Sequence, residues 1–302
     1  MSKITGRKMS IRRTTEDYIV DALVYILLVL IAFVTIYPFY YVILASLNDG
    51  YDMMRGRTFL YPTKFTLMNY QNFLSDENWT KAFVVSVLRT LSGTLLSTIL
   101  TCMVAYGLSR RHLMFRKVYL FMIVFSMYFS GGLIPYYVVL RNLNLLNKFY
   151  VYIIPTMLNL FFVLVGISFF RSIPEALFES AKLDGANELV VLFKIVLPVS
   201  LPFIATLALF SGVGQWNSWL DSTYFVRDEN LRTMAYRMVE QINRTMISEN
   251  STAQGSVDSG TIPTMLTAQS TAVVISMLPI MCVYPFLQKY FIKGIMLGSV
   301  KE

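Results

Sequence analysis

Few residues of this 302-residue chain are suited to catalysis, and none of them stands at a catalytic spacing. His112 is the only histidine, and Cys102 and Cys282 are the only cysteines, so neither a Cys/His metal site nor a disulfide framework can be assembled. The sequence also lacks a G-x-x-x-x-G-K-[ST] loop for cradling phosphates. We therefore expect no catalytic residue, no metal site and no cofactor bound by this chain itself.

A group of polar and aromatic residues interrupts an apolar run near position 217. Gln215, Trp216, Asn217 and Trp219 lie close together there. Indole rings can stack on the apolar faces of pyranoses, and amides can hydrogen-bond to hydroxyl groups, so these types suit contacts with a sugar. For the tryptophans, an aromatic belt at a membrane interface is the alternative.

Two of the polar groups need partners if they lie in a bilayer. Helical spacing brings Asn217 into line with Leu220 and Asp221, which predicts a polar stripe toward a cavity mouth. Arg89 lies inside another apolar run, near the expected outer face. We expect Arg89 to snorkel outward, and the alternatives are an ion pair with Asp221 or with a uronate on a substrate.

The composition is that of a membrane protein, with 55% hydrophobic residues, 15% charged residues and a mean hydropathy of +0.55. The net charge of +8 comes from short clusters rather than a continuous basic stripe, which argues against a nucleic-acid partner. Six apolar segments are long enough to cross a bilayer as helices. They are approximately Ala22–Leu47, Ala82–Leu108, Val118–Leu140, Phe149–Phe170, Ile195–Leu220 and Thr271–Leu287. We expect one all-α transmembrane domain over residues 1–302.

The distribution of Lys and Arg predicts that both termini lie in the cytoplasm, most clearly from the basic loop 110–117. Two long segments would then be external, Asn48–Lys81 and Asp221–Ala268. Long loops usually have a function, and we expect Asp221–Ala268 to contact an external partner. For its Ser/Thr-rich part, Ser248–Thr261, a solvated tether is an equal alternative.

The two glycines at 131 and 132 follow Ser130 within the third apolar segment. We expect them to allow close helix packing, and local unwinding beside Pro135 is the alternative.

Between the fourth and fifth segments, Pro174–Asn187 predicts a short cytoplasmic surface helix that Gly185 ends. Its apolar side would carry Leu177, Phe178, Ala181 and Leu183. Small Ala181 and flexible Gly185 would let a partner approach closely, and Glu179 and Asp184 could meet basic groups on that partner. An amphipathic helix lying on the membrane is the alternative.

Three short motifs identify this segment as similar to the EAA loop of bacterial ABC importer permeases. They are Glu179-Ser180-Ala181, Asp184-Gly185-Ala186 and Ile195-Val196-Leu197-Pro198, with Ser180 as the one departure. The resemblance implies a coupling loop over residues 174–198 that is seated in a groove of an ATPase subunit. The residues carried over to this contact are Glu179, Ser180, Ala181, Asp184, Gly185 and Ala186.

Motifs elsewhere most resemble carbohydrate-type permeases, such as the smaller maltose-importer subunit. They include 105–110, 129–135, 215–219 and 289–294. The resemblance implies alternating access in a bacterial cytoplasmic membrane, with a homologous second permease, an extracytoplasmic binding protein and an oligosaccharide substrate. Two ATPase subunits would bind ATP and Mg. The alternatives are a permease for a non-sugar solute, a membrane-embedded enzyme, and a channel or secondary carrier, but the spans hold few ionisable groups and no internal repeat.

Overall fold

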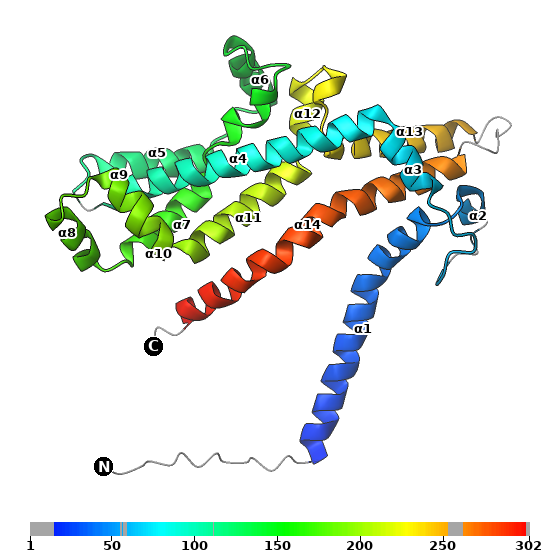
Figure 1. Ribbon diagram of the computed structural model, residues 1–302, viewed down its shortest axis with the longest axis horizontal. Helices are drawn as coiled ribbons and strands as arrows, with labels where there is room; N and C mark the ends of the chain where they lie inside the picture. Colours follow the sequence, from blue (N-terminus) through cyan, green and yellow to red (C-terminus); the bar gives the residue numbers. More distant parts are fainter. Residues whose placement is uncertain (1–14, 55, 57–58, 111, 253–261, 300–302) are drawn as a thin grey trace.

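The computed structural model describes residues 15–54, 56, 59–110, 112–252 and 262–299, which fold into helices joined by turns (Figure 1). The long helices are α1 (Thr15–Ser46), α4 (Glu77–Ser109), α11 (Leu201–Asn217), α13 (Met234–Thr252) and α14 (Ile262–Ser299). The shorter α-helices are α2 (Gly50–Met54), α3 (Met68–Ser75), α5 (Arg116–Tyr128), α6 (Leu133–Asn142), α7 (Leu160–Arg171), α8 (Glu175–Leu183), α9 (Glu188–Val191), α10 (Leu197–Val199) and α12 (Leu220–Phe225). The remaining turns are η1 (Phe149–Tyr152), η2 (Ile154–Thr156), the π-helical η3 (Leu192–Val196) and η4 (Glu229–Leu231). Within these ranges the only β pairing is one isolated bridge, between Asn48 and Phe65.

Helix α4 is the centre of the bundle and packs against α7, α11 and α13. Asp76 caps its N-terminus, because its carboxylate accepts a hydrogen bond of 2.9 Å from the Asn78 N–H. A Cβ atom at Gly166 of α7 would lie 2.8 Å from the Ala105 Cβ atom, so the glycine lets α7 approach α4 closely.

Three helical stretches are long and apolar enough to cross a membrane unbroken: Thr15–Ser46, Glu77–Ser109 and Leu266–Pro285 within α14. Three bent pairs of helices pass the same test together, so the described chain offers up to six spans by length and composition. The bent pairs lie over the predicted third, fourth and fifth segments. The six-span topology itself stays a prediction.

The first bend contains two glycines, Gly131 and Gly132, and prolines lie close to the other two bends. The angle is 117° between α5 and α6, 43° between Phe149–Thr156 and α7, and 87° between Glu188–Val199 and α11. At the first bend, the close-packing role expected for Gly131 and Gly132 is wrong. Gly132 has a φ of +85° and no atom within 4 Å of a Cβ placed on it, so it serves the local unwinding of the third segment.

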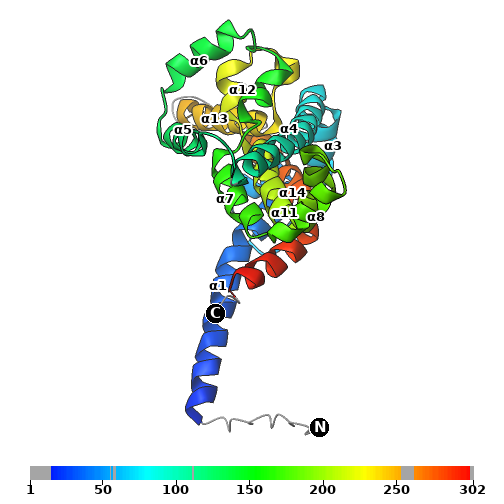
Figure 2. The same cartoon turned by 90° about the vertical axis from the view of Figure 1, so that its left-hand side faces the viewer.

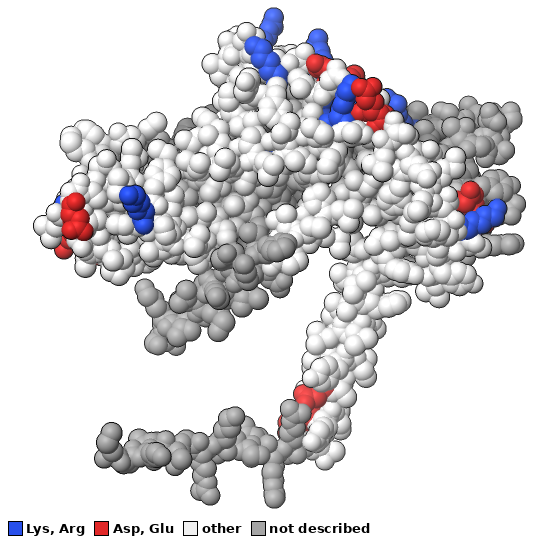
Figure 3. Space-filling model, in the orientation of Figure 1, with Lys and Arg blue, Asp and Glu red and all other residues white. Residues whose placement is uncertain are grey.

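Helix α1 leaves the body as a separate arm, and its C-terminal part contacts the N-terminal part of α14 (Figures 1 and 2). Its most apolar window of 18 residues is not buried against the rest of the described chain. A helix that is apolar on all sides belongs in lipid or in a protein core. On the face shown in Figure 3, charged residues gather at the ends of the body and around α6 and α12, with uncharged surface between them.

Candidate functional site

The predicted surface helix exists as α8, and it is fixed to the bundle by one face. Phe178 and Ala181 are 7% and 5% exposed and belong to a core cluster shared with α4, α7 and α9. The opposite side is open, because Leu183 is 90% exposed and Leu177 is 42% exposed. The helix therefore has an inner face that anchors it and an outer face with two bare leucines.

A hydrogen-bonded turn ends α8 at the predicted glycine. The Gly185 N–H donates to the Lys182 carbonyl and the Ala186 N–H donates to the Ala181 carbonyl, both at 3.0 Å. Gly185 has a φ of +77°, a conformation that side chains disfavour. The predicted end of the helix is confirmed.

The coupling residues expected from the sequence fall on two different sides. Glu179, Ser180, Asp184 and Gly185 are exposed, whereas Ala181 is buried and Ala186 is half-buried against the same core. The role expected for Ala181, close approach of a partner, is wrong for this arrangement because its methyl group faces the protein's own helices. The four apolar residues do not share one side, and only Leu177 and Leu183 are available to a partner.

Arg89 lies in a buried polar cluster between α4 and the α11–α12 junction. Its Nε atom donates to Gln215 Oε1 at 2.8 Å, and one of its terminal nitrogens donates to the Ser218 carbonyl at 3.1 Å. The other terminal nitrogen forms an ion pair with Asp221. Arg89 is 1% exposed, so the expected snorkelling is wrong and the alternative ion pair with Asp221 is found. The reason is that α11 ends at Asn217. Beyond this end, the Ser218 carbonyl and the Asp221 carboxylate face α4.

Gln215 joins this cluster to the fourth segment. Its Nε2 atom donates to Thr156 Oγ1 at 2.7 Å while its Oε1 atom accepts from Arg89. The amide lies over Gly93, where a Cβ atom would be only 2.7 Å from Nε2. A side chain larger than hydrogen at position 93 would displace the amide from its partners.

The other three predicted sugar-path residues point away from this cluster. Trp216 is 7% exposed, donates from Nε1 to the Ser276 carbonyl at 3.1 Å and packs edge-on against Phe83. Asn217 is exposed, and the predicted stripe with Asp221 is wrong because the backbone leaves the helix at Ser218. Trp219 is 37% exposed.

The predicted path residues therefore line separate cavities, and Trp216 borders two of them. Arg89 and Gln215 line a polar cavity of about 220 Å³, together with Ser97 and Asn159. Trp216, Asn217 and Trp219 line a second cavity of about 290 Å³ between α11, α13 and α14, together with Met234 and Met238.

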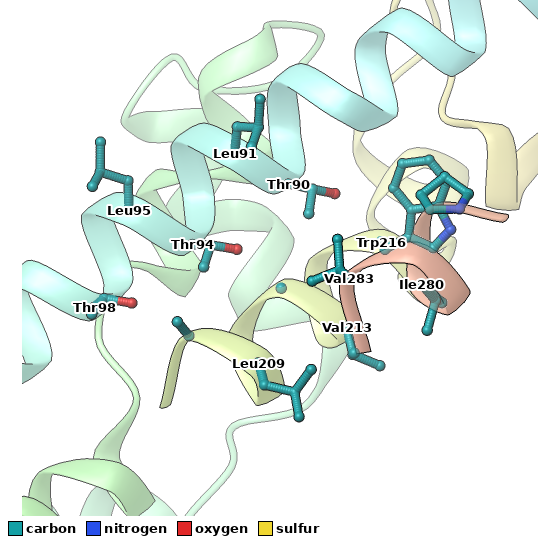
Figure 4. A pocket seen from close by; sticks show the side chains of 13 residues that line it. Thr90, Leu91, Thr94, Leu95, Thr98, Leu209, Val213, Trp216, Ile280 and Val283 are labelled. Atoms are coloured by element: carbon teal, nitrogen blue, oxygen red, sulfur yellow. The ribbon is translucent and has the colours of Figure 1, made fainter. Parts of the chain in front are cut away.

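A third cavity, in which Trp216 is the one lining residue that the sequence analysis named, has a volume of about 410 Å³ and lies between α4, α11 and α14 (Figure 4). Thr90, Thr94 and Thr98 lie along one side of α4 beside it, and their buried hydroxyl oxygens have no hydrogen-bond partner among the described residues. Their spacing of four residues was the available signal, because it places the three side chains on one helix face.

The long segment 221–268 is partly folded onto the bundle. The Tyr152 hydroxyl donates to the Leu231 carbonyl at 2.8 Å, and the Met234 N–H donates to Ser86 Oγ at 2.8 Å. Helix α13 extends to Thr252. Of the predicted tether, residues 253–261 lie outside the described residues.

Helical spans, bent helix pairs and a surface helix seated on their end are the features of a multi-pass membrane protein. Residues 93–296 match the family described as "Binding-protein-dependent transport system inner membrane component", and the chain belongs to this family. The predicted resemblance to ABC importer permeases is thus confirmed, as is the all-α membrane fold class.

Named relatives and a solved structure agree with this assignment. The chain is 39% identical over 289 residues to a polygalacturonan/rhamnogalacturonan transport system permease protein of Bacillus subtilis, covering 95% of this chain and 99% of the relative. It is 26% identical over 281 residues to an arabinooligosaccharides transport system permease protein of Halalkalibacterium halodurans, covering 90% and 93%. A crystal structure of a bacterial ABC transporter involved in import of the acidic polysaccharide alginate matches with a TM-score of 0.82 and 28% identity, covering 92% of this chain and 99% of that chain.

Proposed function

We propose that this chain forms one half of the membrane pathway of an ATP-driven importer for oligosaccharides that contain uronic acids. The family assignment supports the transport role. The names of the relatives support the sugar, because polygalacturonan and alginate are both acidic polysaccharides. The other half of the pathway is a homologous permease, and an extracytoplasmic binding protein delivers the sugar. The chain lies in a bacterial cytoplasmic membrane with both termini in the cytoplasm.

The observation that carries this proposal is the two-faced seating of α8. Its inner face is fixed to the transmembrane core through Phe178, and its outer face exposes Leu183 and Glu179. A leucine that is 90% exposed at the end of a well-anchored helix suits burial in a groove of another protein. We assign that partner as an ATPase subunit, which would bind ATP and Mg, so this chain performs no catalysis itself.

Transport then follows from a difference in binding between two states of the bundle. An ATPase pair shifts the bundle toward the outward-facing state only if it binds that state more tightly. Helix α8 is the contact through which this difference in ATPase binding acts on the chain. Hydrolysis removes the difference, and the bundle returns to the inward-facing state with the sugar.

The docking role is tested with Leu183→Asp and Glu179→Lys, co-expressed with the second permease and the ATPase. Both side chains are exposed, so we expect normal insertion and folding. Loss of an interface anchor costs about 2 kcal/mol or more, which is about 30-fold in affinity. We expect less ATPase to co-purify with the variants and sugar uptake to fall. Met114→Asp is the matched control, because Met114 is 73% exposed on a neighbouring cytoplasmic turn.

Unchanged co-purification and uptake in both α8 variants would contradict the docking role and favour an interfacial helix. Gly185→Trp is a weaker probe, because the positive φ at Gly185 makes any side chain there strained whatever the partner does.

The substrate is tested separately, through the binding protein that serves this importer. A thermal-shift screen against a glycan panel should show stabilisation by oligogalacturonates or other uronate oligomers and little effect of neutral glycans. Uptake of the same sugars should require this chain. Stabilisation by a non-sugar solute alone would overturn the sugar assignment and leave the docking result untouched.

Contact with the binding protein is assigned to the segment that follows α12. The supporting observations are its length and the helix α13 that it places against α4 and α14. Deletion of residues 253–261 should lower the ATPase activity that the binding protein stimulates without changing the basal activity. Wild-type stimulation after this deletion would reduce residues 253–261 to a tether.

A further inference from the structure

Arg110, the residue that follows α4, joins three elements at the end of the bundle that carries α8. One of its terminal nitrogens lies 3.0 Å from Glu188 Oε2 on α9 and 2.5 Å from the Tyr106 hydroxyl on α4. The Tyr106 hydroxyl also donates to the same carboxylate oxygen at 2.5 Å. These contacts close a small ring of hydrogen bonds between α4 and α9.

The same guanidinium group is held between two aromatic rings. Its Cζ atom lies 4.6 Å from the centroid of Tyr106 and 4.1 Å from the centroid of Phe178 on α8. Phe178 is the aromatic anchor of α8 in the core. A planar cation that stacks on rings and reaches a carboxylate is a role for arginine, because lysine can supply the charge but not the flat face.

Helix α4 is suited to carry a movement from this point. It has 33 residues and contains no proline, whereas prolines lie within α14 and beside the break between α10 and α11. Its other polar anchor is Arg89, 21 positions before Arg110, which is about 30 Å along a helix with a rise of 1.5 Å per residue. One stiff helix thus joins the seat of α8 to the buried cluster at the break after α11.

We infer that Arg110 is a positioning residue that clamps the coupling helix α8 to α4, so that a displacement of α8 by the ATPase moves α4 and the Arg89 cluster with it. This inference rests on the proposed function of α8 as the docking site. Without the clamp, the ATPase would still bind the outer face of α8. The movement would then be absorbed at the contact of Phe178 with the core instead of passing into the membrane.

The test compares Arg110→Lys, Arg110→Gln and the control Lys117→Gln in the reconstituted importer. Lys117 is an exposed basic residue on the first turn of α5, a helix that contacts α4, so its replacement removes a positive charge that takes no part in the clamp. Four quantities are measured: ATPase co-purification, basal ATPase activity, stimulation by the loaded binding protein, and sugar molecules imported per ATP hydrolysed.

We expect Arg110→Gln to keep ATPase co-purification and basal hydrolysis while sugar imported per ATP falls about fivefold or more, the lower end of the usual coupling between sites. Arg110→Lys should fall between Arg110→Gln and wild type, because it keeps the charge and loses the stacking. Lys117→Gln should match wild type.

Two outcomes would overturn the clamp. One is an unchanged ratio of sugar to ATP in Arg110→Gln. The other is a parallel loss of co-purification, hydrolysis and import in both Arg110 variants, which is the signature of a residue that only stabilises the fold. If α8 is not the docking site of the ATPase, the result is different, because Leu183→Asp would then leave co-purification of the ATPase unchanged.

Discussion

Replacement of Arg89 by methionine should destabilise the protein strongly, because it leaves a carboxylate without its cation. Arg89 is 1% exposed and the side chain of Asp221 is 23% exposed. Loss of one partner of a buried ion pair costs about 3–5 kcal/mol. We take about 3 kcal/mol, because Asp221 keeps some contact with solvent. Gln215 and the Ser218 carbonyl also lose a donor in Arg89→Met.

The assay is the apparent melting temperature of the detergent-solubilised protein, followed by size-exclusion chromatography after heating. The shift falls with chain length and is about 2 °C per kcal/mol at the upper end of the 150–250-residue range, so about 3 kcal/mol predicts a fall of about 5 °C for this chain of 302 residues. The double variant Arg89→Met/Asp221→Leu removes both charges. It should recover at least half of the loss, since no uncompensated charge then remains buried.

The single variant Asp221→Leu completes the comparison. The reasoning is refuted if the losses of Arg89→Met and Asp221→Leu simply add in the double variant, because addition means that the two side chains do not interact. Sugar uptake gives an independent check. A role confined to the fold predicts equal losses for acidic and neutral sugars in Arg89→Gln. A selective loss for acidic sugars at an unchanged melting temperature would show instead that Arg89 reaches the substrate.

Three further predictions concern packing and orientation. Trp216→Ala should lower the melting temperature, since truncation of a buried tryptophan costs about 3–5 kcal/mol, whereas exposed Trp219→Ala should leave it unchanged; equal shifts would contradict the burial difference. Gly93→Ala puts a methyl carbon 2.7 Å from a buried amide nitrogen on α11 and should cost about 1–3 kcal/mol, so wild-type stability would disprove that contact. In a chain without its two native cysteines, Arg227→Cys should react with an impermeant thiol reagent in intact cells and Lys117→Cys should not, and the reverse pattern would invert the topology.

The coupling segment was largely predictable, because its signals are local. Pro174 and Gly185 bound a short helix, and the Gly185 conformation depends only on neighbouring carbonyls. Which of its apolar side chains faces inward was not predictable. Ala181 lies inside because α4, α7 and α9 meet beneath α8, and a single helical period does not reveal where the rest of the protein lies.

The predicted polar stripe from Asn217 to Asp221 is wrong because of one residue, Ser218. It assumed that a single helix continues through Asn217 to Asp221, but the backbone becomes extended at Ser218. That break turns Asp221 toward Arg89 and sends Asn217 to the surface. Neither glycine nor proline marks this position. The Asp221 carboxylate there accepts a hydrogen bond of 3.1 Å from the Ser218 hydroxyl and pairs with Arg89, so one local and one long-range contact hold the break.

The distribution of breaks among the spans follows from the cost of exposed backbone in a bilayer. A break in a spanning helix leaves N–H and C=O groups without helical partners, so it persists only where other groups satisfy them. At the break after α5, the Gly132 N–H donates to Ser130 Oγ at 3.3 Å. At the break after α11, Arg89 donates to the Ser218 carbonyl. The second break therefore depends on a side chain from α4, the one helix that contacts both α7 and α11 extensively and contains no proline. A change in the position of α4 would withdraw the donor from that carbonyl, so the shape of the fifth segment and the position of α4 cannot vary independently.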